Sequence, residues 1–181
     1  MRCPPCFFQV VGPSGRLARP LIRAAAAIAL AGFASLAAAI APGETAPDVQ
    51  LDAAHGPAHL SALRGKLVYL DFWASWCGPC RQSFPWMNGL QTRFGAQGLQ
   101  VVAVNVDARA EDARRFLAEV PAQFTVAYDP KGQAPRQYAI KGMPTSVLIG
   151  PDGKVLLVHS GFRAEDRTDI EQAIAQSLPR R

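Results

Sequence analysis

The chain has 181 residues, of which 49% are hydrophobic and 18% charged, so it is long enough for one globular domain and too short for a large multidomain enzyme. This balance also excludes a wholly disordered protein. The formal net charge of +5 is typical of some nucleic-acid binders, but residues 1–41 hold four arginines and no acid. The remaining residues carry 15 bases against 14 acids, so we expect no nucleic-acid partner.

An uncharged apolar segment follows the basic N-terminus. Residues 24–41 consist mainly of Ala, Ile, Leu and Phe, which is the layout of a secretory signal sequence. We predict cleavage after Ala39, because Ala37 and Ala39 are the small residues that a signal peptidase requires, although ~18 apolar residues would also suffice for an uncleaved anchor. Residues 1–41 are therefore predicted to be a signal peptide or signal anchor. Residues 42–181 form the exported domain, which contacts the membrane only through the leader if that leader is uncleaved.

The four cysteines divide between the leader and the exported domain. Cys3 and Cys6 lie in the leader, with no strand or helix pattern around them, and we assign them no function. An exported domain of roughly 140 residues is large enough to fold without disulfide staples. Its two cysteines, Cys77 and Cys80, are therefore available for chemistry.

The sequence of the exported domain predicts alternating strands and helices. Residues 42–57 are rich in Pro and Gly and are predicted to run along the surface, with one short strand at 49–51. The predicted elements that follow are, in chain order, a strand at 66–73, a helix at 77–94 kinked at Pro85, a strand at 99–107, a helix at 111–120, a strand at 125–128, a helical turn at 134–138, strands at 145–149 and 154–160, and a helix at 165–178. The turn at 150–153 predicts an antiparallel hairpin at one edge. This order predicts an α/β fold in which helices cover both faces of a mixed sheet.

Cys77 and Cys80 stand where a predicted strand is followed by a predicted helix. A thiol in the first helical turn faces unpaired backbone N–H groups and the positive end of the helix dipole, which favour the thiolate. We therefore expect the pKa of Cys77 to be lowered toward ~7 and Cys77 to act as the nucleophile. Cys80, one turn further in, is placed to attack the mixed disulfide that Cys77 forms with a target. Pro79 suits an early helical position because its missing N–H would have no helical partner there.

The residues around this pair resemble the thioredoxin superfamily. The matching active-site run is Asp71-Phe72-Trp73-Ala74-Ser75-Trp76-Cys77-Gly78-Pro79-Cys80-Arg81. Pro85 matches the proline within that family's first long helix, the segment 142–145 matches its cis-proline loop, and Gly161 matches the glycine beside its substrate groove. The resemblance implies that Pro144 is cis and faces the dithiol, and that the Met143 backbone pairs with a target segment. The substrate-binding residues implied in this way, or by proximity to the nucleophile, are Trp76, Gly78, Pro79, Met143, Pro144, Thr145 and Gly161.

Within this superfamily, the leader and the segments 111–141 and 141–162 are similar to the exported TlpA/ResA-like thiol-disulfide oxidoreductases, over roughly residues 44–178. This similarity implies a thioredoxin fold with a TlpA-type βα insert at about 111–141, and a protein-disulfide reductase. It also implies disulfide-containing exported proteins as targets, such as apocytochrome c or copper-carrying oxidase-assembly proteins, and an inner-membrane thiol transporter as electron donor. In a Gram-negative bacterium the protein would lie in the periplasm. We expect a monomer without cofactor or metal.

Asp71 is a carboxylate within an apolar strand. Burial there raises the pKa of a carboxyl group, so such a residue is paired, functional, or at a strand end that reaches solvent. By analogy with thioredoxin, Asp71 lies behind Cys80 and relays its proton. The lysine that neighbours this acid in thioredoxin aligns here with Ala103, which predicts a further raised pKa for Asp71.

Metal sites are the alternatives for the cysteine pair. His55 and His59 together with Cys77 and Cys80 have zinc-like spacing, but the histidines fall in a Gly/Pro loop. Soft thiolates also select Cu(I), and a copper(I) metallochaperone of the Sco-like kind is the alternative function. Against it, those proteins have three residues between the cysteines, where this sequence has two, and His159 is the one candidate for their distal histidine. A peroxiredoxin-type P-x-x-x-T-x-x-C run is absent from the sequence.

Overall fold

A computed structural model describes residues 40–53, 56 and 58–178. The predicted leader, its cleavage after Ala39, and the cysteines Cys3 and Cys6 lie outside the described residues. The predicted division of the chain at residue 41 therefore stays a prediction.

Five strands form one mixed sheet in the order β3-β2-β1-β4-β5. The central strand β1 pairs in parallel with β2 and antiparallel with β4, while β3 and β5 form the two edges. The strands are β1 (Leu67–Trp73), β2 (Leu99–Asn105), β3 (Thr125–Tyr128), β4 (Thr145–Ile149) and β5 (Val155–Ser160). The predicted mixed sheet and its antiparallel edge hairpin are thus confirmed.

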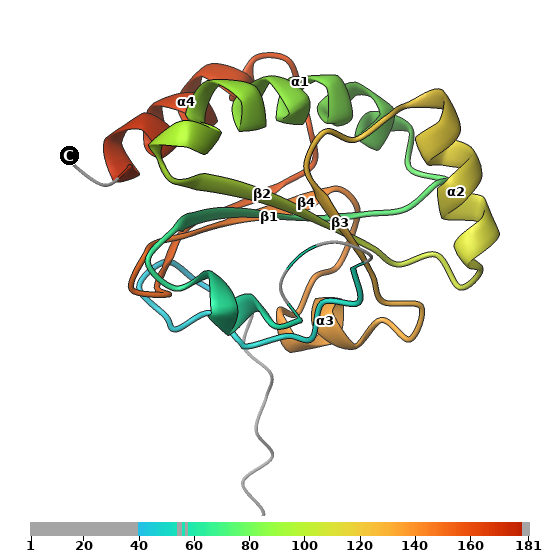
Figure 1. Cartoon of the computed structure of the whole chain (residues 1–181), viewed down its shortest axis with the longest axis horizontal. Helices are drawn as coiled ribbons and strands as arrows, with labels where there is room; N and C mark the ends of the chain where they lie inside the picture. Colours follow the sequence, from blue (N-terminus) through green and yellow to red (C-terminus); the bar gives the residue numbers. More distant parts are fainter. Residues whose placement is uncertain (1–39, 54–55, 57, 179–181) are drawn as a thin grey trace, which may run out of the picture. The chain divides into compact units, whose positions relative to one another are not determined.

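Helices lie on both sides of this sheet, as predicted. Figure 1 shows α1 and α4 above the sheet, α2 beside α1, and α3 below the sheet. The α-helices are α1 (Gly78–Phe94), α2 (Ala110–Glu119), α3 (Gln133–Gln137) and α4 (Asp166–Ser177), and two 3₁₀ helices that the sequence did not indicate are η1 (Leu60–Leu63) and η2 (Gly95–Gln97). Pro85 lies inside α1, which continues through it to Phe94. None of the helices among the described residues is long and apolar enough to span a membrane.

Alternate side chains of β1 separate two cores, one on each face of the sheet. On the face covered by α1, α2 and α4, Tyr69 and Trp73 join a core that includes both Cys77 and Cys80. Within this core the rings of Trp73, Phe84 and Phe116 pack together, with centroid separations of 4.7 to 5.0 Å. The dithiol segment is therefore held by large aromatic side chains on the first face.

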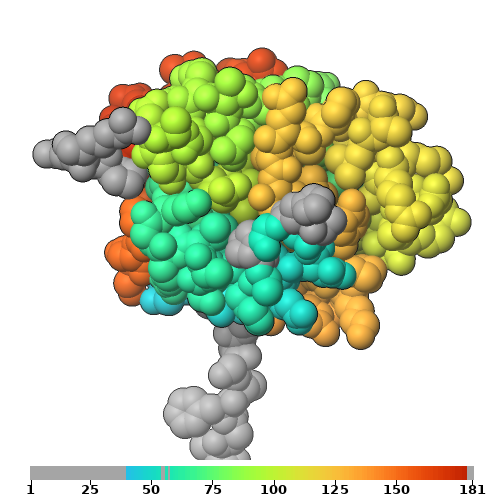
Figure 2. Space-filling model, in the orientation of Figure 1, coloured from blue at the N-terminus to red at the C-terminus, as the bar shows by residue number. Residues whose placement is uncertain are grey.

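The opposite face is covered largely by the segment that precedes β1. Val49 and Leu51 are buried in this second core, so the predicted surface course of residues 42–57 is wrong for these side chains. The predicted strand at 49–51 is also wrong, because this segment makes isolated bridges, including Asp52 with Tyr128, and no continuous ladder. Figure 2 shows it, in blue to teal, beside the orange residues around α3.

The second strand ends two residues earlier than predicted. The sequence favours a strand at 99–107, but β2 stops at Asn105. The Asn105 side-chain oxygen accepts a hydrogen bond from the Asp107 N–H at 3.1 Å, and this local turn diverts the backbone from the sheet. Asp107 is thereby directed toward the loop that precedes the cysteines.

Candidate active site

Cys77 and Cys80 lie at the start of α1, directly after the loop that follows β1. Cys77 is the N-cap residue of α1, and Pro79 occupies the early helical position expected for it. The two sulfurs form a disulfide with a Cα–Cα separation of 5.3 Å. The pair predicted from the sequence is therefore seen here in its oxidised form.

The Cys77 sulfur replaces the side-chain oxygen that usually caps a helix. Its Sγ accepts a hydrogen bond from the backbone N–H of Cys80 at 3.3 Å. After reduction the same N–H and the positive helix end would stabilise a thiolate at Cys77. Cys77 is 3% exposed and Cys80 is fully buried, so an approaching target reaches Cys77 first.

One large side chain beside the pair is open to solvent. Trp76 is 71% exposed, although it is flanked by the buried Cys77. Gly78 and Pro79, between the cysteines, are also exposed. These three residues form an exposed rim around the disulfide.

The remaining predicted substrate-binding residues gather at the loop before β4. The Met143–Pro144 peptide bond is cis, as expected. Thr145 Oγ1 donates to the carbonyl of Gly142 at 2.7 Å, and the Gly161 N–H donates to the carbonyl of Pro144 at 2.8 Å. All of them line a cavity of about 440 Å³, in which Trp76, Gly78 and Pro79 have no part. The structure thus brings together Met143, Pro144, Thr145 and Gly161 as one group and the rim residues as another.

Asp71 is buried on the dithiol side of the sheet. It lies between Tyr69 and Trp73 on the same face of β1, and those two neighbours pack in one core with the cysteines. At 1% exposure it does not reach solvent, so a strand-end aspartate is the wrong interpretation. Its Oδ1 accepts a hydrogen bond from Ser146 Oγ at 2.7 Å.

Burial changes the acid–base behaviour of this carboxyl group. Desolvation raises the pKa of Asp71 from 3.8 to about 7, and the hydrogen bond from Ser146 opposes the rise. The β1–β2 register places Ala103 opposite Asp71. The position that aligns with thioredoxin's lysine therefore carries only a methyl group here. Ser146 is therefore the polar partner of this acid, and no motif in the sequence identified it.

Asp107 anchors the loop that leads from β1 to Cys77. Its carboxylate accepts hydrogen bonds from the Ser75 N–H at 2.9 Å and the Ser75 hydroxyl at 3.0 Å. It also accepts one from the Asn105 side-chain amide at 2.8 Å. No motif in the sequence predicts this positioning role. The available signal was the place of Asp107 just after a buried parallel strand, because sites in α/β sheets form at the carboxyl ends of such strands.

We expect Asp107→Ala to destabilise the protein by about 2–3 kcal/mol, because three donors around the loop lose a charged acceptor. Ser75→Ala removes only the hydroxyl and should cost about 1 kcal/mol. Urea unfolding of the two variants and of the double variant measures these effects. The combined loss should be smaller than the sum, since both changes delete the same contact, and strict additivity would show that Asp107 does not hold Ser75.

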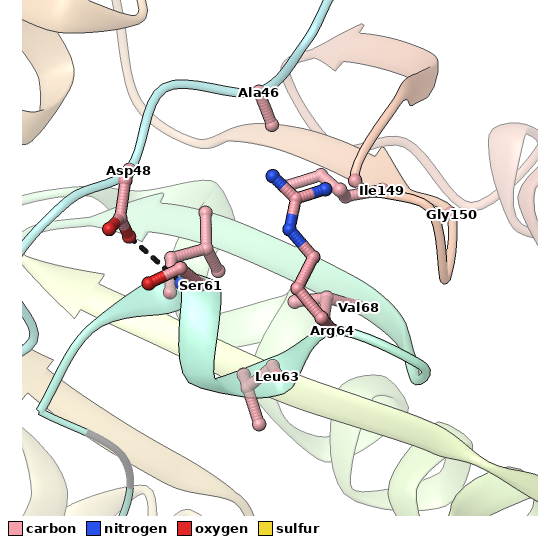
Figure 3. Close-up of a pocket in the computed structure, with 10 residues that line it drawn as sticks. Ala46, Asp48, Ser61, Leu63, Arg64, Val68, Ile149 and Gly150 are labelled. Carbon is pink, nitrogen blue, oxygen red and sulfur yellow. Dashed lines mark hydrogen bonds between the residues drawn. The ribbon is translucent and has the colours of Figure 1, made fainter.

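A small pocket near the N-terminal segment is unrelated to the cysteines. It has a volume of about 20 Å³, room for about one water molecule. Figure 3 shows the Arg64 side chain extended into it and the hydrogen bond from the Ser61 N–H to Asp48. The pocket is lined by Val68 and other residues of the second core, so it lies across the sheet from the disulfide.

The metal alternatives find little geometric support in the part of the chain that is described. Within residues 40–53, 56 and 58–178, no three His, Cys, Asp or Glu residues are grouped as a metal site would require. His55 lies outside the described residues. His159 is on β5, where its Nε2 lies 3.2 Å from Asp166 Oδ2.

Comparisons with known proteins agree with this geometry. A family model described as Redoxin matches residues 41–174. Thiol-disulfide oxidoreductase ResA of Geobacillus thermodenitrificans is 34% identical over 150 residues, covering 82% of this chain and 85% of the relative. ResA of Bacillus subtilis is 37% identical over 127 residues, covering 70% and 71%. A crystal structure of a Chlorobium tepidum protein assigned as thiol:disulfide interchange protein DsbE has 59% identity and a TM-score of 0.75, covering 78% of this chain and 100% of that one.

The fold and the paired cysteines, with these similarities, define a thiol-disulfide oxidoreductase of the thioredoxin superfamily. The chain belongs to the Redoxin family, and its cysteine pair and its relatives place it among the ResA/DsbE-type enzymes.

Proposed function

We propose that this protein acts as a reductant outside the cytoplasm, where its Cys77/Cys80 dithiol reduces disulfides of other exported proteins. The observation that carries the proposal is the cysteine pair at the N-terminus of α1, with Cys77 Sγ accepting the Cys80 N–H and the more deeply buried Cys80 one turn behind. Cys77 thiolate attacks a target disulfide, and Cys80 then attacks the resulting mixed disulfide. The target leaves as a dithiol, and the protein is left oxidised.

Asp71 serves this cycle by accepting the proton of Cys80. Cys80 must lose its proton to become the attacking thiolate, and a buried acid with a pKa of about 7 can exchange protons near neutral pH. Trp76 and the 143–145 segment, with Gly161, receive the target chain on either side of the disulfide. This proposal is supported by the exposure of Trp76 and of Gly78 and Pro79 between the cysteines.

The direction of electron flow follows from the redox poise of the pair. The Gly-Pro spacer is similar to that of thioredoxin, whose potential of about −270 mV makes it a donor of electrons. Equilibration with glutathione buffers measures the potential of the dithiol. A value near −120 mV, as in strong oxidants, would overturn the reductase assignment.

Partners and location belong to the same proposal. The apolar segment 24–41 supports export, with the periplasm as the compartment in a Gram-negative bacterium. An inner-membrane thiol transporter recharges the dithiol, because a reductant in an oxidising compartment needs electrons from the cytoplasm. The targets are exported proteins with reducible disulfides, in cytochrome c maturation or in the assembly of copper sites of oxidases.

A trapping experiment tests the proposal. In Cys80→Ser the resolving thiol is absent, so Cys77 should stay in a mixed disulfide with its target. We expect the full-length variant, isolated from its own cells, to carry a covalent partner that a reducing agent releases and mass spectrometry identifies. Cys77→Ser is the matched control and should carry none. Equal capture by both variants, or capture that survives reduction, would contradict the proposed exchange.

A further inference from the structure

A row of polar residues crosses the sheet beside the disulfide. In the strand register, Asp71 of β1 is opposite Ser146 of β4, and Ser146 is opposite His159 of β5. Directly opposite side chains in an antiparallel pair have Cβ atoms about 4.5–5.5 Å apart. The three side chains therefore stand next to one another on the face that carries α1 and α4, among otherwise apolar neighbours.

The inner end of this row is closed to solvent. Asp71 is buried, Ser146 is buried, and Ser146 Oγ lies 2.7 Å from Asp71 Oδ1. Asp71 Oδ2 has no hydrogen-bond partner among the described residues, and the opposite neighbour on β2 is the apolar Ala103. Within the sheet, the polar route away from Asp71 thus leads through Ser146.

The outer end of the row lies at the start of α4. The His159 side chain is 20% exposed, while its Nε2 atom is itself buried and lies 3.2 Å from Asp166 Oδ2. Arg163, largely exposed, donates to both Asp166 oxygens at 3.0 and 3.1 Å. These hydrogen bonds lower the pKa of Asp166, which keeps an anion beside the imidazole.

The charged groups that face the two ends are few. Asp71 has Tyr69 on its own strand and the cysteines of α1 on the same face. His159 faces Asp166 from the first turn of α4, with Arg163 and Glu165 in the segment that leads into it. An imidazole has two ring nitrogens and can take up a proton at one and release it at the other, so His159 is chemically suited to pass a proton between Ser146 and the start of α4.

We propose that Ser146 and His159 form a proton relay that connects Asp71 with solvent at the N-terminus of α4. The inference rests on the proposed function, in which Asp71 takes the proton of Cys80. It adds the route by which this buried acid exchanges the proton with water. Ser146 and His159 are positioning and relay groups, and neither contacts the reacting sulfurs.

Each proton has a defined course in this scheme. As Cys80 attacks, the Cys77–Cys80 bond forms, the bond between Cys77 and the target sulfur breaks, and the target leaves as a thiolate. The Cys80 proton passes to the Asp71 carboxylate. The protonated Asp71 gives it to Ser146 Oγ while Ser146 gives its own hydroxyl proton to His159. The imidazolium then releases a proton to water, and Ser146 ends with the single proton it had before.

The test follows the step that uses Cys80. The reduced full-length protein is mixed with oxidised glutathione, and tryptophan fluorescence separates formation of the mixed disulfide from its resolution. We expect His159→Ala to slow resolution on the order of tenfold. This loss is smaller than the roughly hundredfold or greater contribution of a direct general acid or base, because Asp71 is still present to take the proton of Cys80. Formation of the mixed disulfide should not change. Added imidazole should restore the resolution rate, since the His159 side chain is partly exposed and its removal leaves a space that a small molecule can enter from solvent.

Matched variants separate proton transfer from structure. His159→Gln can still hydrogen-bond to Asp166 but cannot carry a proton, so it should be slowed as much as His159→Ala. Ser146→Ala should also slow resolution, without rescue by imidazole, because the break lies deeper in the row. His59→Ala, on the opposite side of the sheet, is the control and should behave as the wild type. In an Asp71→Asn background, His159→Ala should have no further effect.

Three results would overturn the relay while leaving the proposed reductase function intact. One is an unchanged resolution rate in His159→Ala and Ser146→Ala. Another is a slowed resolution in His159→Ala that imidazole does not reverse, or a wild-type resolution rate in His159→Gln. Either result would indicate a structural role for His159. The third is a His159→Ala change that slows resolution as much in the Asp71→Asn background as in the wild type. Loss of mixed-disulfide formation by the wild-type protein would instead contradict the proposed function itself.

Discussion

Cys77→Ser is expected to reduce the rate of insulin-disulfide reduction to that of the reductant alone. The serine hydroxyl is not ionised near neutral pH, so the backbone N–H groups at the start of α1 have no anionic nucleophile to stabilise. Cys80, fully buried one turn further in, cannot take over the attack on a target. Precipitation of reduced insulin, followed by turbidity, measures the rate.

Cys3 and Cys6, which lie in the predicted leader, provide the matched control for this prediction. Cys3→Ser combined with Cys6→Ser removes two thiols, yet the rate of insulin reduction should stay at the wild-type value. Activity that survives Cys77→Ser and is lost in the leader variant would place the redox centre at Cys3 and Cys6.

The sheet and its layers were predictable because their signals are local or repeat along the chain. The apolar run that became β1, the turn at 150–153 and the stripe of apolar residues in α1 each specify one element. Once these elements alternate, the mixed sheet follows from general rules of chain connection. Element ends were harder to predict, since side-chain hydrogen bonds decide them, as Asn105 does at the end of β2.

The segment before β1 was predicted less well because its order depends on distant parts of the chain. Pro and Gly in residues 42–57 correctly indicated irregular backbone. They could not show that Val49 and Leu51 pack against the sheet, because that burial depends on a face formed by residues much later in the sequence. Tertiary contacts thus decide whether an irregular segment is surface or core.

The site shows the same division between local motif and long-range register. The cysteine pair and the cis-proline loop are short patterns that any reader of the sequence can find. Ser146 and Asp107 belong to no such pattern. Their partners, Asp71 and Ser75, lie 75 and 32 residues away, and only the order of the strands brings them together. Residues that tune a site are for this reason harder to predict than residues that perform its chemistry.

Relative to the wild type, Asp71→Asn is expected to raise the free energy of unfolding of the oxidised protein more at alkaline pH than at acid pH. The folded-state pKa of Asp71 is about 7, and its unfolded value is near 3.8. Between these values the folded state binds the extra proton, so the wild-type free energy of unfolding falls as pH rises toward 7 and is level above it. A shift of about three units corresponds to roughly 4 kcal/mol, which the asparagine removes.

Urea unfolding at about pH 4, 7 and 8.5 measures this difference, with the disulfide intact so that the cysteines do not titrate. The advantage of Asp71→Asn over the wild type should grow by roughly 4 kcal/mol from the lowest to the highest pH, with most of the change complete near pH 7. Asp169→Asn, at an exposed position of α4, is the control and should show no such growth. A parallel course for Asp71→Asn and the wild type would mean that Asp71 ionises in the folded protein as readily as in the unfolded chain. Burial beside Ser146 would then impose no penalty on the charged form, and Asp71 could not hold a proton near neutral pH.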